Sequence, residues 1–183
     1  MDQLLMYKTD GLDADDSLPE GYVFDTHREE YVQRWIDLMT EAIGGGWSVE
    51  NFKKNMLSRA GIYPDGIFYI INEKSGIIAS ATGIAGEDGI TGDLHMVAVS
   101  PGYRGKGLSF PLCARVINYL NGRGIKKIKL TTDDHRVPAI KTYLKLGFIP
   151  VLSDDTMAGR WNALSGRIPY LNAVEYFKKI PSI

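Results

Sequence analysis

A basic, glycine-rich loop between an apolar strand and an amphipathic helix is the part of the sequence best suited to bind a ligand. The loop, residues 104–109 (RGKGLS), follows the apolar run 97–99. Glycines let the backbone approach a ligand closely and adopt positive φ values. The first amides of a helix have no partner within the helix and carry part of a positive charge. Because Arg104 and Lys106 add full charges, the loop is expected to bind an anion, for which phosphate is the usual ligand.

Two other phosphate-binding loops do not fit these residues. The nucleotide-binding P-loop requires Gly-Lys followed by Ser or Thr, whereas Lys106 here precedes the last glycine of the loop. The dinucleotide fingerprint requires a glycine where Phe110 stands and an acidic residue about twenty positions later. A glycine-rich turn is by itself often only a turn, so a second motif is needed to assign a function.

The second motif is Ala139-x-x-x-Tyr143-x-x-x-Gly147-Phe148. It predicts a short helix with Pro138 in its first turn and Gly147 as its C-cap, and the helix leads into a strand at Phe148. Taken alone, Tyr143 would be a half-buried aromatic residue of an ordinary helix.

Together the two motifs resemble those of the GCN5-related N-acetyltransferases, over residues 67–149. In that family Arg-x-x-Gly-x-Gly/Ala binds the pyrophosphate of coenzyme A, and Ser109 replaces the last Gly/Ala here. The resemblance implies an α/β (α+β) fold with a mixed, strongly twisted central sheet and helices on both faces. It also implies a V-shaped splay between the two central parallel strands, which holds the pantetheine arm of acetyl-CoA.

The resemblance also implies which residues bind the cofactor. Backbone amides along Val97, Ala98 and Val99 would contact pantetheine and the thioester carbonyl, which requires no particular side chain. The phosphates would contact the loop residues Arg104, Gly105, Lys106, Gly107, Leu108 and Ser109. One family feature is missing, because an Asn that often contacts the pantetheine region is replaced by Arg136.

Transfer of an acetyl group from a thioester to an amine requires that a thiolate be protonated and an ammonium deprotonated. A phenol with a pKa of about 10 is a plausible donor to a thiolate with a pKa of about 8.5. The resemblance places Tyr143 at the thioester sulfur, which makes it the candidate acid. An alkyl ammonium has a pKa of about 10.4, so a base is required as well.

Asp93 and His95 are the candidate bases. Strand alternation predicts that they share one face with Val97 and Val99, unless a bulge interrupts the strand. An acid at the place of Asp93 is the base in histone acetyltransferases, and histidines matching Asp93 and His95 serve in serotonin N-acetyltransferase. An unperturbed His95 would have a pKa near 6.5, which suits a base at neutral pH. Asp93 is alternatively a turn residue, and His95 a structural histidine of the strand.

The sequence predicts the elements that position these residues. Strands are expected at residues 3–8, 67–71, 77–84, 93–100, 125–131 and 148–149, with a loop over 10–20. Helices are expected to begin at a capping box Thr26–Glu29, at Ser48 and after the glycine-rich loop, the last ending near Asn121. The strand–helix–strand order around the loop predicts parallel pairing of the two strands.

Composition limits the class of protein. The chain has 183 residues with 44% hydrophobic content, which predicts a single domain over 1–183. Within it, residues 10–60 are expected on the acceptor side and 93–149 in the acetyl-CoA-binding core. The single Cys113 excludes a disulfide framework and is expected to be a buried core thiol. No apolar stretch has the length of a membrane span and no signal peptide is recognised, so a cytoplasmic protein is expected.

The charge distribution is uneven although the net charge is −1. Residues 1–30 hold nine Asp and Glu against two Lys and Arg, and residues 101–150 hold ten Lys and Arg against two Asp. The basic part coincides with both motifs, and the acidic segment would attract a cationic amine. No nucleic-acid-binding motif is present, so nucleic acid is not expected as a partner.

The sequence therefore predicts an acetyl-CoA-dependent N-acetyltransferase that acts on a primary amine of a small molecule, without a metal or membrane. Alternatives are a peptide or protein acceptor, through its N-terminus or a lysine, and a non-catalytic acyl-CoA-binding module. Residues 152–170, with Trp161, Arg160 and Arg167, would form a wall of the acceptor site or a contact in a homodimer.

Overall fold

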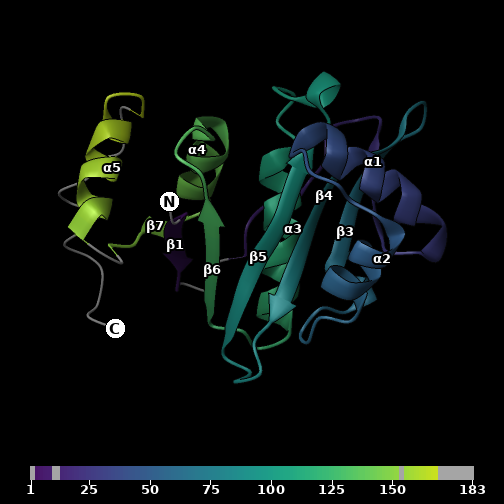
Figure 1. Cartoon of the computed structure of the whole chain (residues 1–183), viewed down its shortest axis with the longest axis horizontal. Helices are drawn as coiled ribbons and strands as arrows, with labels where there is room; N and C mark the ends of the chain where they lie inside the picture. The colour runs from purple at the N-terminus through teal and green to yellow at the C-terminus, as the bar shows by residue number, and fades with distance from the viewer. Residues whose placement is uncertain (1–2, 10–12, 153–154, 169–183) are drawn as a thin grey trace.

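A mixed seven-stranded sheet with helices on both faces forms the centre of the computed structural model, which describes residues 3–9, 13–152 and 155–168 (Figure 1). The strand order is β2-β3-β4-β5-β6-β1-β7. The strands are β1 (Leu4–Lys8), β2 (Tyr22–Thr26), β3 (Ile67–Asn72), β4 (Gly76–Ala85), β5 (Thr91–Val99), β6 (Lys127–Thr132) and β7 (Ile149–Pro150). Only β5 and β6 pair in parallel among the described strands. The predicted fold class is confirmed.

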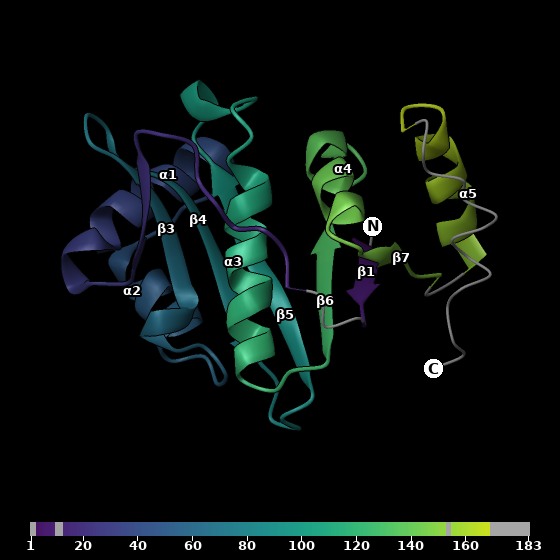
Figure 2. The same cartoon turned by 180° about the vertical axis from the view of Figure 1, so that it is seen from behind.

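The helices form two layers, one on each face of the sheet (Figures 1 and 2). One layer holds α1 and α2, and the other holds α3 and α4. The helices are α1 (Val32–Ala42), α2 (Val49–Phe52), α3 (Ser109–Gly122), α4 (Val137–Lys145) and α5 (Asp155–Ser165). A π-helical turn, Lys53–Leu57, continues α2.

Each face of the sheet has its own hydrophobic core. Between the sheet and α1 and α2, the fully buried aromatic side chains are Trp35, Phe52 and Tyr69. On the other face, buried residues of α3 pack against the sheet, α4 and α5, and Cys113 among them is a free core thiol as predicted. Two packed layers fix the positions of the strands from both sides, so the site residues lie on a rigid scaffold.

The predicted capping box at Thr26–Glu29 is wrong. Thr26 is the last residue of β2, where it pairs with Phe68 of β3, and α1 begins only at Val32 after a 3₁₀ turn, Glu29–Tyr31. Strand pairing keeps Thr26 extended, which removes it from the cap position. The second predicted cap is confirmed, because Ser48 Oγ accepts a hydrogen bond from the Asn51 amide at 3.1 Å.

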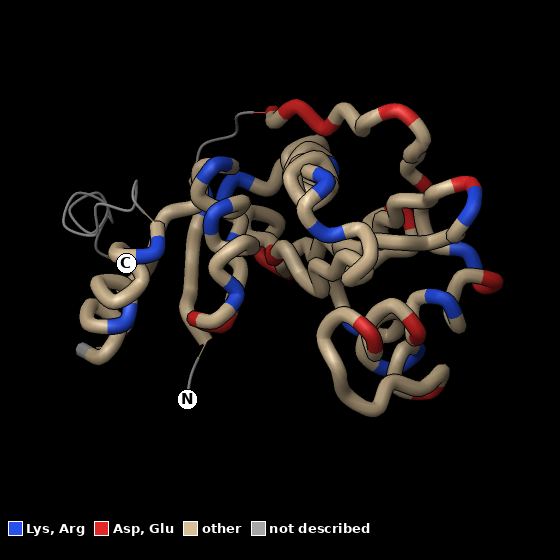
Figure 3. Tube along the Cα trace, turned by 90° about the horizontal axis from the view of Figure 1, so that it is seen from above, with Lys and Arg blue, Asp and Glu red and all other residues tan. Residues whose placement is uncertain are grey.

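The described part of the acidic N-terminal segment crosses the outer side of α3 (Figures 2 and 3). The Asn118 side chain exchanges two hydrogen bonds with the Ala14 backbone, at 3.1 and 2.9 Å. Arg115 forms an ion pair with Asp16 at 2.9 Å. Asp16 and the segment around it therefore lie on the face of the sheet opposite α1 and α2. Residues 10–12 of the predicted loop lie outside the described residues.

Helix α5 packs onto the α3 and α4 side of the molecule. Its Trp161 is completely buried, and Arg160 pairs with Asp134 in the loop before α4. Trp161 therefore belongs to the core. Of the predicted acceptor wall or dimer contact, residues 153–154 and 169–170 lie outside the described residues, as do residues 171–183.

A glycine in the turn between α2 and β3 tests this packing. Gly61 has φ +81°, and a Cβ there would lie 2.0 Å from the Ala85 carbonyl oxygen. Gly61→Ala is expected to lower the free energy of unfolding by about 3 kcal/mol, measured by denaturant titration. Gly124→Ala is the control, because Gly124 has φ +86° with no atom within 4 Å of the Cβ position. It should cost only about 1 to 2 kcal/mol, and an equal loss in both variants would contradict the close contact.

Candidate active site

The parallel pairing of β5 and β6 is short. It comprises Thr91 with Lys127, Gly92 with Ile128 and Asp93 with Lys129. Beyond Asp93 no further pair joins these two fully described strands, and Figure 1 shows them close at one end and separated at the other. Each strand keeps its other neighbour, β4 for β5 and β1 for β6. The sheet thus opens between its two parallel strands, which confirms the predicted splay.

Strand β5 carries a bulge on this open side. His95 pairs with Thr82 and Ala98 with Ser80, so β5 contains one residue more than β4 over this interval. Met96 adopts φ +50°, the only positive φ of a non-glycine residue among those described. A bulge leaves the backbone groups of the extra residue outside the ladder, where they can meet a ligand.

The bulge also changes which side chains share a face. Asp93 and His95 lie on the face of α1 and α2, and after the bulge Ala98 takes up that face. Val97 and Val99 pack against the core on the α3 side. The prediction that Asp93, His95, Val97 and Val99 share one face is therefore wrong, because one extra residue reverses the alternation.

The glycine-rich loop has the backbone geometry expected of an anion site. Gly105 and Gly107 both have φ +76°, and no atom lies within 4 Å of the Cβ position of either. Helix α3 begins at Ser109, the last residue of the loop, with no side-chain cap and no acidic residue in its first turn. Leu108 is buried and anchors the loop to the core. The loop therefore presents backbone amides and open space to a ligand.

The two loop cations have partners within the protein. Arg104 donates from Nε to the Val99 carbonyl at 3.2 Å and from Nη2 to the Ala42 carbonyl at 3.1 Å. The Lys106 ammonium lies 4.7 Å from the centroid of the Tyr103 ring. Arg104 thus links the loop to the ends of β5 and α1, and both charges stay at the loop.

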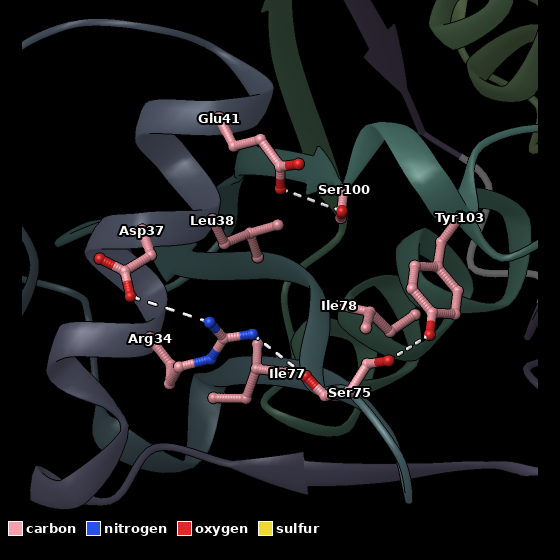
Figure 4. Close-up of a pocket in the computed structure, with 9 residues that line it drawn as sticks. All are labelled: Arg34, Asp37, Leu38, Glu41, Ser75, Ile77, Ile78, Ser100 and Tyr103. Carbon is pink, nitrogen blue, oxygen red and sulfur yellow. Dashed lines mark hydrogen bonds and ion pairs between the residues drawn. The ribbon is translucent and has the colours of Figure 1, made fainter.

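A pocket of about 430 Å³ lies beside the loop, between α1, the β3–β4 turn and Ser100 (Figure 4). Its lining residues are Arg34, Asp37, Leu38, Glu41, Ser75, Ile77, Ile78, Ser100 and Tyr103. Many of its polar groups bond across it: Ser100 donates to Glu41 at 3.0 Å and Tyr103 to Ser75 at 2.6 Å. These bonds hold the start of the loop against α1 and the turn.

Tyr143 lies on the opposite face of the sheet from His95. It is buried in the core on the α3 side, with its ring edge-to-face to Phe148 at 6.1 Å. Burial raises the pKa of its phenol well above the usual value. As predicted, α4 has Pro138 in its first turn; its C-cap is Leu146, and the predicted cap Gly147, with φ +87°, is the residue after it.

Asp93 and His95 belong to a charged cluster on the α1 and α2 face. The Arg59 guanidinium lies 3.3 Å from His95 Nε2 and 4.0 Å from Asp93 Oδ2. The Lys129 ammonium lies 3.5 Å from Asp93 Oδ1. Sequence reasoning missed both cations as site residues, since Arg59 lies far from β5 in the chain and only the fold brings it there.

His95 does not have the unperturbed pKa that the sequence suggested. Burial and the nearby Arg59 charge lower the pKa of His95 to about 4. The imidazole is therefore neutral at pH 7, and its Nε2 lone pair accepts a hydrogen bond from Arg59, so it binds a proton more weakly than an exposed histidine.

Arg136, at the position of the missing family Asn, is held by an ion pair with Asp133 at 3.0 Å. Within residues 3–9, 13–152 and 155–168, no group of three or more His, Cys, Asp or Glu side chains is placed to hold a metal ion. None of the described helices is long and apolar enough to cross a membrane.

Comparison with protein families matches residues 23–148 to the acetyltransferase (GNAT) family. Among curated proteins, a mycothiol acetyltransferase of Thermobispora bispora is 28% identical over 145 residues, covering 72% of this chain and 48% of the relative. A mycothiol acetyltransferase of Thermobifida fusca is 32% identical over 105 residues, covering 53% of this chain and 32% of the relative. The chain thus spans about half or less of these relatives.

Solved structures agree in fold. The crystal structure of a GCN5-related N-acetyltransferase from Sphaerobacter thermophilus matches with a TM-score of 0.69 and 21% identity, covering 82% of this chain and 50% of that one. The ribosomal-protein-S18-alanine N-acetyltransferase from Escherichia coli matches with a TM-score of 0.56 and 21% identity, covering 69% and 76%. At this identity the likeness concerns the fold.

The low pKa of His95 can be measured by NMR titration of its imidazole. The expected midpoint is about 4, and Arg59→Gln should move it upward because a nearby positive charge disappears. Arg59→Lys should leave it low because the charge is kept. A midpoint near 6.5 in the parent, or no difference between the two variants, would contradict the described surroundings of His95.

Proposed function

Because the chain belongs to the acetyltransferase (GNAT) family, we propose that it binds acetyl-CoA and transfers the acetyl group to a primary amine of a small molecule. One observation carries the proposal: an open glycine loop at the head of α3 lies directly after the strand that separates from its parallel neighbour. An anion site next to an opening in the sheet suits a cofactor with a pyrophosphate and a long thin arm.

In this proposal the pyrophosphate binds the backbone amides of Gly105–Ser109, with the charges of Arg104 and Lys106 nearby. The pantetheine arm runs along β5 between the two parallel strands, where the amides of Val97, Ala98 and Val99 bind its polar groups. The bulge at Met96 supports this role because it takes backbone groups of β5 out of the ladder.

The acetyl group then lies in the opening between the two faces of the sheet. The amine approaches from the α1 and α2 face, where its nitrogen attacks the thioester carbonyl carbon and passes a proton to the base. As the carbon–sulfur bond breaks, the thiolate leaves toward the α3 and α4 face and takes a proton from Tyr143. An acid and a base on opposite faces suit this geometry. The base takes the proton of the amine on one face, and the acid donates its proton to the thiolate on the other, so the two do not exchange a proton directly.

The raised pKa of Tyr143 makes it a weaker acid than a free phenol. The same surroundings also disfavour a thiolate, as burial raises the pKa of the neighbouring Cys113 thiol to about 12. A departing thiolate in the same surroundings would likewise be a stronger base than in water, which favours proton transfer from Tyr143 to it.

Two groups stay candidates for the base. His95 is neutral, but its Nε2 lone pair accepts from Arg59 and its low pKa makes it a weak proton acceptor, so it would have to release Arg59 to take the amine proton. Asp93 is charged but has a cation within 4.0 Å of each carboxylate oxygen. The names of the curated relatives support a small-molecule amine as acceptor. A single domain over residues 1–183, a cytoplasmic location and a homodimer stay predictions.

The loop assignment predicts that Gly107→Glu abolishes acetyl-CoA binding in calorimetry, because it adds bulk and negative charge where the phosphates would lie. The backbone strain of a side chain at φ +76° must be controlled. Gly89→Glu provides the control, since Gly89 has φ +66°, open space at Cβ and a place in the β4–β5 turn. Unchanged affinity in Gly107→Glu, or equal losses in both variants, would reject the loop as the phosphate site.

The acid assignment predicts that Tyr143→Phe lowers kcat by about one to three orders of magnitude with little change in acetyl-CoA affinity. Tyr119→Phe is the matched control, because Tyr119 bonds Asp65 away from the site. Steady-state kinetics with a competent amine measures both variants. A parental kcat in Tyr143→Phe would leave the residue only its packing role.

A further inference from the structure

The turn between α2 and β3 holds Arg59 against the sheet by backbone contacts. The Gly61 carbonyl accepts a hydrogen bond from the Ala85 amide of β4 at 2.9 Å. The Ile62 amide donates to the Arg59 carbonyl at 3.2 Å, and the Ile62 side chain is buried. Arg59 therefore stands on a fixed turn, and its side chain reaches the first half of β5.

The guanidinium of Arg59 keeps hydrogen-bonding capacity toward solvent. Its side chain is 44% exposed, and the hydrogen-bonding and ionic contacts of its guanidinium with described residues are those to His95 at 3.3 Å and Asp93 at 4.0 Å. A guanidinium has five N–H donors in a planar fork. Several donors are thus available to a ligand in front of the two candidate bases.

The charges of the cluster do not cancel. Arg59 and Lys129 are cations and Asp93 is their shared anion, while His95 is neutral at pH 7. One positive charge is left over at the place where the proposed acceptor enters. An alkyl ammonium alone adds to this excess, whereas an acceptor that also carries an anionic group removes it.

We propose that Arg59 selects acceptors in which a carboxylate lies close to the reacting amine, as in an α- or β-amino acid. The guanidinium fork matches the two oxygens of a carboxylate. Asp93, 4.0 Å from the guanidinium, faces the ammonium of the same molecule. Arg59 is then a specificity residue that takes no part in proton transfer. The inference rests on the proposed function, since it concerns the acceptor of that reaction.

A pair of matched acceptors tests this selection. β-Alanine and propylamine are both primary amines on a three-carbon chain, and only the first carries a carboxylate. The ratio of their kcat/KM values, from acetyl-CoA-dependent thiol release, should favour β-alanine by about tenfold or more. Arg59→Gln should remove this preference, mainly by raising the KM for β-alanine, and Arg59→Lys should retain part of it.

Lys54→Gln is the matched control, because it removes an exposed positive charge from the adjoining helical turn. It should leave the ratio at the parental value. Equal kcat/KM values for the two acceptors in the parent, or a preference that survives in Arg59→Gln, would overturn the assignment of Arg59.

A binding measurement separates this inference from the proposed reaction. N-acetyl-β-alanine and N-propylacetamide, the acetylated forms of the two amines, are titrated into the protein while the His95 imidazole is observed by NMR. Only the carboxylate compound should shift the resonance in the parent, and the shift should be absent in Arg59→Gln. No shift, or one that persists in Arg59→Gln, overturns the inference. If none of the amines tested supports thiol release but the expected shifts are seen, the proposed reaction is rejected and the carboxylate site is retained.

Discussion

Backbone pairing between β5 and β6 stops after Asp93 and Lys129, and the other features of the candidate site depend on this separation. Each strand is held by its other neighbour and by a helix layer, so the opening costs few hydrogen bonds and leaves the rest of the sheet intact. A continuous sheet would keep the α1 and α2 face apart from the α3 and α4 face. In the proposed reaction, the separated strands let groups on both faces act on the thioester bond.

The bulge at Met96 and the glycine loop extend this opening into a binding path. The bulge frees backbone groups of β5, and the positive φ values of Gly105 and Gly107 turn the chain so that α3 starts with its amides exposed. Arg104 and the hydrogen bonds across the neighbouring pocket hold the loop to α1.

Local patterns were sufficient to predict some elements. The loop, the start of α3 and the glycine after the end of α4 depend on residues close together in the chain, and the structure confirms them. The placement of Asp93 and Val97 on opposite faces could not be predicted, because the bulge is fixed by the register of β5 against β4. The predicted cap at Thr26 was wrong for a related reason, because pairing with β3 keeps Thr26 in an extended conformation. Arg59 reaches His95 only through tertiary folding.

A crystal structure of the protein with acetyl-CoA tests most directly whether the cofactor lies between the separated strands. The predicted result places the pyrophosphate oxygens on the amides of Gly105–Ser109 and the pantetheine arm along Val97–Val99. The thioester sulfur is then nearer to Tyr143 than to His95. A cofactor bound in the pocket beside Arg34, or on any other surface with the opening empty, would contradict this arrangement.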